Sequence, residues 1–382
     1  MDFEFDEEVV MIRDMMRRFV QKDARPLEMP LFNQGELTTE QEDDLKHKIM
    51  EQMGLWAVTV PEEYGGDELD ALSACLIEEE LGQTFVPVDY GDISPVLFAC
   101  NEQQTIEFLE PAVEGDRRPL LALREPVPAA PAPRDVSGAL APDAWQTTAV
   151  AVEDGYVLNG RKLLGHKLRE DDFFVVFARM PTHEQGVTAF LVEPDTSGLA
   201  TNGALEIILQ DCVLPPGAVL GEVGKGLELG TEFLAHAQIK MGARYVGMAQ
   251  RLLDMSAEYA RDWVSLGQPL ALRPAVMRMV AEMAADIHAA RYMVYHAAWL
   301  LDEEEDAHHQ AAMVRLFTAQ MVRSAIDKTI MVHGGTSYLE KDPALRMYRN
   351  LVPDAAMEIG LENSRMAVAN QYLQLLELLS EG

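Results

Sequence analysis

Cysteine is scarce in this chain of 382 residues, and the three that occur, Cys75, Cys100 and Cys212, lie far apart. None belongs to a Cys-x-x-Cys pair, and none has a histidine nearby at metal-ligand spacing. A disulfide framework and a cysteine-based metal site are therefore not expected. Because unpaired cysteines are typical of a reducing compartment, we expect a cytoplasmic protein without a bound metal.

Long apolar runs and basic residues are also lacking. No stretch approaches the roughly 18 apolar residues of a membrane span, and the first residues have neither the basic nor the apolar region of a secretory signal. The 31 Lys and Arg residues against 63 Asp and Glu residues give a net charge of -32. Nucleic acid and anionic membranes repel such a protein, so neither is expected as a partner. Adaptation to high salt is the alternative interpretation of the charge.

The spacing of apolar residues changes twice along the chain, which predicts an α+β protein of two or three packed units. Helical periodicity over residues 1–120 indicates an N-terminal helical domain. Strand and turn signals over residues 121–225 indicate a β-domain, and helical periodicity returns over residues 226–382.

In the first part, apolar residues recur at three-and-four spacing between residues 9 and 20 and predict a helix. A second helix is expected from Thr39, because Glu42 three residues later fits a capping box. A short extended stretch is expected at residues 58–60, before a further helix over residues 71–81.

In the middle part, β-prone segments alternate with turns. Strands are expected over residues 147–152, 156–158, 173–180 and 187–192, with turns at residues 154–155 and 159–160. The Pro- and Ala-rich residues 126–142 predict a loop.

In the last part, Pro274 is expected to begin a long helix, since proline is tolerated in the first turn. Further helices are expected near residues 308–332 and 358–379.

Several short motifs, in this order along nearly the whole chain, resemble those of acyl-CoA dehydrogenases. They are Gly-x6-Pro-Glu-x-Tyr-Gly-Gly at residues 54–66, Glu-Glu-Leu-Gly at residues 79–82, Glu-Pro at residues 125–126, Gly-Tyr-x-Leu-Asn-Gly-x-Lys at residues 155–162, and Gly-Gly followed by Pro and Arg-x-Tyr-Arg at residues 334–349. The resemblance implies that family's fold: an N-terminal helical domain, a middle β-barrel or sandwich domain and a C-terminal four-helix bundle.

The resemblance also implies the chemistry, which is FAD-dependent α,β-dehydrogenation of an acyl-CoA thioester to the 2-enoyl-CoA. In the family a glutamate beyond the Gly-Gly motif removes the α-proton, and the same spacing leads to Glu358. Members with the base elsewhere carry an acid where this chain has Ala237 and Gln238. The other interpretation of Glu358 is a solvated acid near a helix N-terminus, where acids are favoured.

The resemblance assigns a further set of residues to FAD. They are Glu125, Pro126, His166, Gly334, Gly335 and Gly360. The paired glycines permit close backbone approach. His166 follows the hairpin where the family has Trp and a hydroxyl, and it is the candidate replacement donor, although an ordinary surface or core role is the alternative.

Several flavin contacts of the family are missing. The loop at residues 124–131 lacks the family's Gly and Ser, and Trp263 begins the segment where the family has an Arg that pairs with the pyrophosphate. Arg261 or Arg273 is a candidate replacement for that charge. Losses of this kind resemble members that act on steroid side-chain CoA thioesters as mixed tetramers.

The expected partners are therefore an acyl-CoA substrate, a homologous dehydrogenase subunit in a hetero- or homotetramer, and an electron-transfer flavoprotein. Two alternatives stay open: a non-catalytic subunit that stabilises an active dehydrogenase subunit, and an acyl-CoA oxidase in which oxygen reoxidises the flavin.

Overall fold

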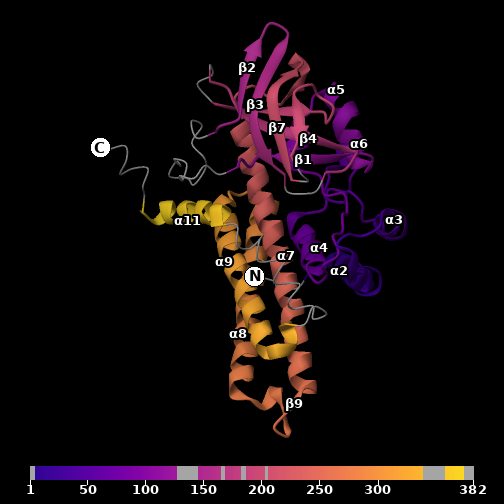
Figure 1. Cartoon of the computed structure of the whole chain (residues 1–382), viewed down its shortest axis with the longest axis vertical. Coiled ribbons are helices and arrows are strands. Elements are labelled where there is room, and N and C mark those ends of the chain that lie inside the picture. The colour runs from indigo at the N-terminus through magenta and orange to yellow at the C-terminus, as the bar shows by residue number, and fades with distance from the viewer. Residues whose placement is uncertain are drawn as a thin grey trace. The chain divides into compact units, whose positions relative to one another are not determined.

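The structure is a computed structural model. It describes residues 5–126, 145–164, 168–181, 186–202, 205–338 and 358–373. The described residues group into two compact units. The helical unit takes its residues from 1–55, 69–90 and 235–382, and the sheet unit takes its residues from 56–68 and 91–234. The helical unit therefore combines both ends of the chain, whereas most of the sheet unit comes from its middle (Figure 1). Domain boundaries near residues 120 and 225 stay a prediction.

The N-terminal helices of the helical unit are α1 (Glu7–Phe19), α2 (Glu28–Gln34), α3 (Thr39–His47) and α4 (Ala71–Leu81). The predicted apolar stripe is confirmed in α1, where Ile12, Met16 and Phe19 are buried. The helix at residues 71–81 is also confirmed. A π-helical segment over residues 20–24 and a 3-10 turn over residues 25–27 join α1 to α2. A second π-helical segment, over residues 48–53, extends α3.

The predicted start of α3 at Thr39 is confirmed, but the predicted capping box was wrong by one residue. The cap is Thr38, whose Oγ1 accepts a hydrogen bond from the Gln41 N–H at 3.3 Å. Gln41 Oε1 accepts in return from the Thr38 N–H at 3.0 Å. Thr39 and Glu42 repeat the same spacing one position later, so the capping-box pattern alone was not able to select the register.

Three acids of α4 tie together the helices of this unit. Each is buried, and each pairs with an arginine from a different helix. The pairs are Glu78–Arg244, Glu79–Arg291 and Glu80–Arg17, with N–O distances of 2.6, 2.8 and 2.6 Å. At Gly247 the backbones of two helices touch, because an added Cβ would lie 1.8 Å from the Glu79 carbonyl oxygen.

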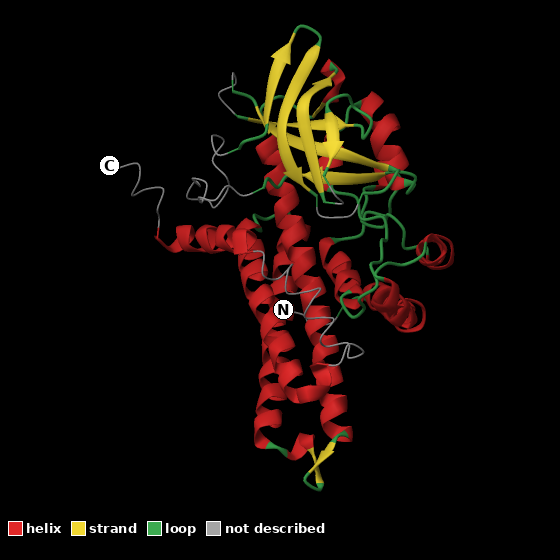
Figure 2. Ribbon diagram, in the orientation of Figure 1, coloured by secondary structure: helices red, strands yellow, loops and turns green. Residues whose placement is uncertain are grey.

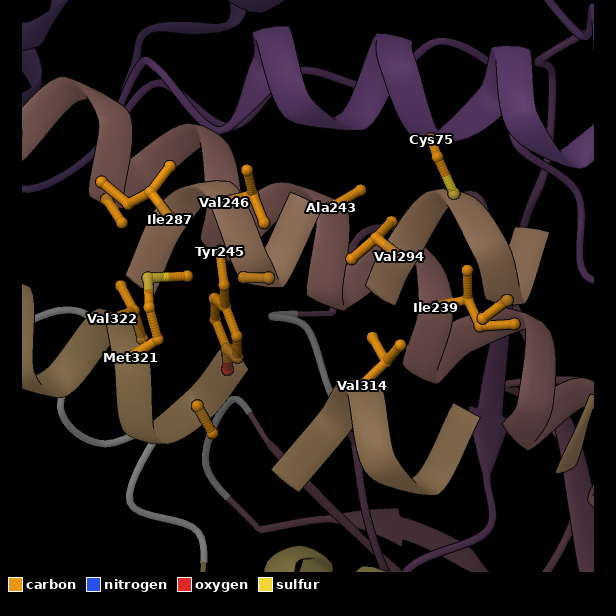
Figure 3. Packing of buried hydrophobic residues seen from close by; sticks show 14 of the residues in the cluster. Cys75, Ile239, Ala243, Tyr245, Val246, Ile287, Val294, Val314, Met321 and Val322 are labelled. Atoms are coloured by element: carbon orange, nitrogen blue, oxygen red, sulfur yellow. The ribbon is translucent and has the colours of Figure 1, made fainter. Parts of the chain in front are cut away.

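The C-terminal helices are α7 (Gly226–Asp262), α8 (Pro274–Asp302), α9 (His308–His333) and α11 (Glu358–Leu373). The predicted start at Pro274 and the helix near residues 308–332 are confirmed. From residue 235 onward α7 packs with α8 and α9. Figure 3 shows Cys75 of α4 within this core, among Ile239 and Val246 of α7 and Val294 of α8.

Among its described residues, the sheet unit has one sheet of eight strands, and strands are yellow in Figure 2. They are β1 (Arg118–Ala122), β2 (Thr148–Val152), β3 (Gly155–Leu163), β4 (Asp172–Arg179), β5 (Val187–Val192), β6 (Leu199–Thr201), β7 (Glu206–Leu214) and β8 (Val219–Leu220). Their order is β6-β7-β3-β2-β4-β5-β8, and β1 pairs with β4 in parallel. Alternate residues of β4 and β5 belong to two different apolar clusters, so both faces of the sheet are buried.

The short helices of the sheet unit are α5 (Glu102–Gln104) and α6 (Glu110–Val113), joined by a wide turn over residues 105–109. Tight helical turns occur at residues 62–64, 95–99 and 216–218.

Two local predictions within the sheet unit were wrong. Residues 58–60 form a turn rather than an extended stretch, because the Val60 N–H bonds to the Ala57 carbonyl at 2.9 Å. Asn159 and Gly160 continue β3 rather than forming a hairpin turn, and Asn159 faces a β-bulge in β7 at Gln210 and Asp211. Asn159 Oδ1 accepts a hydrogen bond from the Asp211 N–H of β7 at 2.9 Å, which fixes the bulge against its neighbouring strand.

The order of helices, strands and helices predicted from the sequence is confirmed. Within the part of the chain that the structure describes, no helix is long and apolar enough to cross a membrane. Among the same residues, no three His, Cys, Asp or Glu side chains gather in a group that would hold a metal ion.

Candidate functional site

Glu125 lies in the sheet unit, where its carboxylate is enclosed by hydrogen-bond donors. The N–H of Gln146 donates to one carboxylate oxygen at 2.8 Å, and the N–H of Thr147 donates to the other at 2.9 Å. Lys162 Nζ lies 2.9 Å from the same oxygen as Thr147 and 4.3 Å from the centre of the Trp145 ring. These contacts join three segments: the residues after β1, those before β2, and β3.

Burial and their mutual attraction shift the pKa values of Glu125 and Lys162 inside the sheet unit. Burial alone would raise the pKa of Glu125, but the Lys162 ammonium and the Gln146 N–H outweigh it and hold that pKa below its usual range. Burial lowers the pKa of Lys162 to about 8, although Glu125 opposes the shift. The pair is therefore ionised at neutral pH and its charges cancel.

The carboxylate of Glu125 thus bonds to groups of its own chain, and it positions Gln146, Thr147 and Lys162. The Leu163 N–H donates to the Arg124 carbonyl at 2.8 Å, so the backbone before Glu125 also bonds to β3. Pro126 follows directly and is half-buried. The residues on either side of the loop predicted at 126–142 are therefore fixed by the same ion pair.

Sequence reasoning quoted Lys162 as part of a motif but missed its pairing with Glu125. A signal was present: side chains alternate along a strand, and Lys162 falls on the same side of β3 as Leu158, which is fully buried. A lysine at an inward position needs an acidic partner, because an unpaired buried charge is costly.

Gly334 and Gly335 lie in the helical unit, directly after α9 ends at His333. Gly334 has φ of +58°, a conformation that favours glycine. No described atom lies within 4 Å of a Cβ added at either glycine. The backbone is therefore open to close approach, which fits the predicted contact with a cofactor.

A stack of three rings stands beside these glycines. The ring of Tyr259 lies 4.4 Å from that of His333, tilted by 38°, and 5.4 Å from that of Trp263, with an angle of 12° between the Tyr259 and Trp263 planes. Thr336 Oγ1 donates to the His333 carbonyl at 2.6 Å and lies 3.2 Å from the Tyr259 hydroxyl. The three rings and the two glycines are called the glycine corner below.

The two arginines predicted as replacement charges flank Trp263 in sequence. Arg261 is exposed in the last turn of α7. Arg273 is half-buried, and its Nη2 donates to the Ser265 carbonyl at 2.9 Å. That bond supports the hairpin of β9 (Val264–Ser265) and β10 (Gln268–Pro269). Gly334, Gly335 and these two arginines therefore stay candidate contacts for FAD.

Glu358 begins α11, and Gly360 lies in the first turn of the same helix. The helix packs on α9, and the ring of Tyr372 near its end lies 5.9 Å from that of His309. His309 is the second residue of α9 and His333 is its last, a separation of about 36 Å along the helix axis. Within one chain, the glycine corner and the last turn of α11 therefore lie at opposite ends of α9.

Several predicted site features lie outside the described residues. They are His166, the side chain of Glu358, residues 127–142 of the predicted loop and the Arg-x-Tyr-Arg part of the C-terminal motif.

Comparison with known proteins places this geometry in context. Residues 6–116 match the family model of the acyl-CoA dehydrogenase N-terminal domain, and residues 224–374 match that of the acyl-CoA dehydrogenase C-terminal domain. The probable acyl-CoA dehydrogenase YngJ of Bacillus subtilis is 31% identical over 399 residues, which cover 98% of this chain and 100% of that protein.

Two further similarities extend over almost the whole length of both chains. The caffeyl-CoA reductase–Etf complex subunit CarC of Acetobacterium woodii is 28% identical, covering 97% of this chain and 99% of its own. The solved structure of butyryl-CoA dehydrogenase from Megasphaera elsdenii is 26% identical with a TM-score of 0.82, covering 98% of this chain and 100% of that chain.

Proposed function

Because this chain belongs to the acyl-CoA dehydrogenase family, we propose that it dehydrogenates an acyl-CoA thioester as one subunit of an oligomer, with Glu358 as the base. Family membership confirms the predicted fold, with N-terminal helical, central sheet and C-terminal helical domains. It also confirms the expectation of an FAD-dependent oxidoreductase that acts on acyl-CoA.

The observation that carries the assignment of Glu358 is its spacing from Gly334 and Gly335, which matches that of the family's catalytic glutamate. The α-proton next to a thioester is only weakly acidic, so its removal needs a positioned base. When bound, FAD supplies the acceptor for the hydride from the β-carbon.

We propose that each catalytic site takes residues from two subunits. The glycine corner and the last turn of α11 lie at opposite ends of α9 in one chain, which supports a division of labour between neighbours. One chain would contribute Glu358 to its own site and its glycine corner to a neighbour's FAD. The homologous partner subunit would be a second copy or a related chain.

We propose that the partner is a related chain, so that the assembly is a hetero-oligomer. The presence of Trp263 where the family has an arginine, at the glycine corner, supports this. A partner that retains the arginine would complete the FAD site that this chain lacks. Such losses resemble members that act on steroid side-chain CoA thioesters, and we propose this substrate as the finer candidate. Activity assays should compare it with butyryl-CoA and a 3-arylpropionyl-CoA, the saturated thioesters that correspond to the relatives' names.

We propose an electron-transfer flavoprotein as the electron partner, supported by the name of the Acetobacterium relative, which is a subunit of a complex with Etf. The alternative, an acyl-CoA oxidase, would release peroxide when substrate is turned over in air. A cytoplasmic location is proposed on the ground that Cys75, Cys100 and Cys212 are all unpaired.

The alternative function is a non-catalytic subunit that stabilises an active dehydrogenase. Two observations favour this alternative. The Glu125 carboxylate is already paired with Lys162, and the Trp263 ring is stacked on Tyr259 where the family has an arginine, so neither side chain supplies charge to FAD. Flavin absorbance should be measured for the chain purified alone and with a co-expressed homologous subunit. Flavin bound to either preparation, with turnover that requires Glu358, supports the catalytic proposal. A flavin-containing complex whose turnover is independent of Glu358 supports the non-catalytic role.

A further inference from the structure

Trp145 of the sheet unit carries a buried polar atom that has no partner. Its side chain is 4% exposed, and its Nε1–H bonds to no described atom. Within the described part of the sheet unit, this is the only buried side-chain nitrogen or oxygen without a hydrogen-bond partner. The large majority of such atoms in proteins are paired, because an unpaired donor in apolar surroundings is costly. The open N–H therefore needs an acceptor that the described residues do not supply.

The other tryptophan of the sheet unit, Trp56, has a satisfied N–H. It is half-buried, and its Nε1 donates to the Val113 carbonyl at 2.8 Å. The same unit thus pairs one indole N–H within the chain and leaves the other open. The two residues form a matched pair for experiment.

The open indole of Trp145 is held in place from several sides. Arg179 Nε of β4 donates to the Trp145 carbonyl at 3.3 Å, and Lys162 Nζ of β3 lies 4.3 Å from the centre of the ring. The ring also belongs to the buried apolar cluster that contains Phe173 of β4. These contacts fix the indole before a ligand arrives, which lowers the cost of binding one.

The surroundings of the ring favour a neutral acceptor. An indole N–H can only donate, so its partner must be an acceptor. Lys162 beside the ring is paired with Glu125 at 2.9 Å, so the charges of that pair cancel and attract no phosphate. The apolar cluster on the ring suits a flat, apolar ligand. Among the groups of FAD, the flavin ring combines neutral carbonyl oxygens with such a body, whereas the pyrophosphate does not.

We propose that the Nε1–H of Trp145 donates a hydrogen bond to a carbonyl oxygen of the flavin ring. The proposal rests on the FAD chemistry of the proposed function and adds a residue from outside the family motifs. The Trp and the hydroxyl that the family has after the β3 hairpin are missing here, and Trp145 replaces them from another segment. Because reduction adds negative charge to the flavin oxygens, Trp145 holds the reduced ring more tightly than the oxidised ring.

Trp145→Phe tests this contact, because it keeps an aromatic ring and removes the N–H. FAD added to the flavin-free protein, alone or in the co-expressed complex, should bind about tenfold more weakly than to the wild type. Riboflavin, which has the flavin ring but neither pyrophosphate nor adenine, should lose affinity by the same factor. The flavin carbonyl band in the Raman spectrum should move to higher wavenumber, since loss of the hydrogen bond strengthens the C=O bond. The reduction potential of the bound flavin should become more negative.

Trp56→Phe is the matched control, the same exchange at an indole whose N–H already bonds within the chain. It should lower the free energy of unfolding of the flavin-free protein and leave the FAD affinity and the carbonyl band unchanged. In Trp145→Phe the flavin-free protein loses packing but no hydrogen bond. Circular dichroism checks that both variants fold.

A measurement on the wild-type indoles does not require Trp145→Phe to fold. The chain has four tryptophans, so NMR of protein with ¹⁵N-labelled indoles should show four N–H signals. The signal of Trp145 is the one that persists in each of Trp56→Phe, Trp263→Phe and Trp299→Phe. It should move downfield when FAD binds, as an N–H does on gaining an acceptor, and the Trp56 signal should stay in place.

Unchanged FAD affinity and an unchanged carbonyl band in folded Trp145→Phe would overturn the proposal, as would a Trp145 signal that FAD does not move. Equal loss of affinity in Trp56→Phe would also overturn it, because the effect would then be one of packing. Weaker binding of FAD but not of riboflavin would place the acceptor on the nucleotide part instead. Absence of flavin from both wild-type preparations would overturn the proposed function itself, whereas the other results leave that function standing.

Discussion

Lys162 Nζ lies 2.9 Å from Oε1 of Glu125, with 0% of the lysine side chain and 9% of the glutamate side chain exposed. Both residues come from segments that resemble acyl-CoA dehydrogenase motifs, yet each satisfies the other rather than a ligand. The ion pair holds the segment before Pro126 against β3. The ion pair therefore contributes to the stability of the sheet unit and fixes the start of the predicted cofactor loop.

Replacing only the lysine should therefore destabilise the sheet unit strongly. Lys162→Met leaves the Glu125 charge buried without its partner, and breaking such a pair typically costs about 3–5 kcal/mol. Urea unfolding should show this loss, and Lys162→Met combined with Glu125→Gln should recover part of it. Lys225→Met, which removes an ion pair to the exposed Glu228 of the sheet unit, should leave the free energy of unfolding nearly unchanged, because exposed ion pairs contribute little. Equal effects at residues 162 and 225 would contradict the account.

The same pair predicts a pH dependence at alkaline pH. The pKa of Lys162 is lowered to about 8 in the folded protein, whereas an unfolded lysine has a pKa of about 10.4. Between these values the unfolded chain binds more protons, so the contribution of Lys162 makes the free energy of unfolding rise with pH. The slope from one proton is at most about 1.4 kcal/mol per pH unit. Subtracting the profile of the Lys162→Met, Glu125→Gln variant isolates this term, and a flat or falling difference would refute it.

The close contact of α4 with α7 predicts that Gly247→Ala will be destabilising. The new Cβ would lie 1.8 Å from the Glu79 carbonyl oxygen, so the two helices must move apart. Overpacking of this kind costs about 1–3 kcal/mol or more. Gly217→Ala is the control, because no described atom lies within 4 Å of its added Cβ. Thermal unfolding should separate the two variants, and an unchanged Gly247→Ala protein would mean that α4 and α7 are not packed this closely.

The glycine corner predicts that Trp263→Arg will tighten FAD binding in the assembled protein. An arginine adds charge-assisted hydrogen bonds to phosphate, worth about 1.5–3 kcal/mol, or roughly ten- to a hundredfold in the dissociation constant. Flavin fluorescence titration measures this change. Trp263→Gln removes the ring without adding charge and should not reproduce it. Equal or weaker FAD binding by Trp263→Arg would show that the corner does not face the pyrophosphate.

The elements predicted best from the sequence are those whose signal is local. The helix at residues 71–81 and the strand at residues 187–192 were placed to the residue, because periodicity and length decide them. The capping box of α3 was misplaced by one residue, because two adjacent threonines offered the same capping pattern. Asn159 failed because its role depends on Asp211 of another strand.

The candidate site was less predictable, since it depends on contacts between distant segments. The motifs identified the family and pointed to Glu125 and the paired glycines. They did not reveal that Lys162 already neutralises Glu125, 37 residues away in sequence. They also did not reveal that Tyr259 stacks between Trp263 and His333, which are not neighbours in sequence.

The central claim, that Glu358 removes the α-proton, is tested most directly by turnover of Glu358→Gln in the flavin-containing oligomer. Glu362→Gln, an exposed acid one turn later on α11, is the matched control. We predict that Glu358→Gln lowers turnover by at least about 10²–10⁴-fold, the usual contribution of a general base, while flavin content and oligomer mass stay unchanged. Glu362→Gln should keep full activity. Full activity of Glu358→Gln would contradict the account and place the base on the partner subunit.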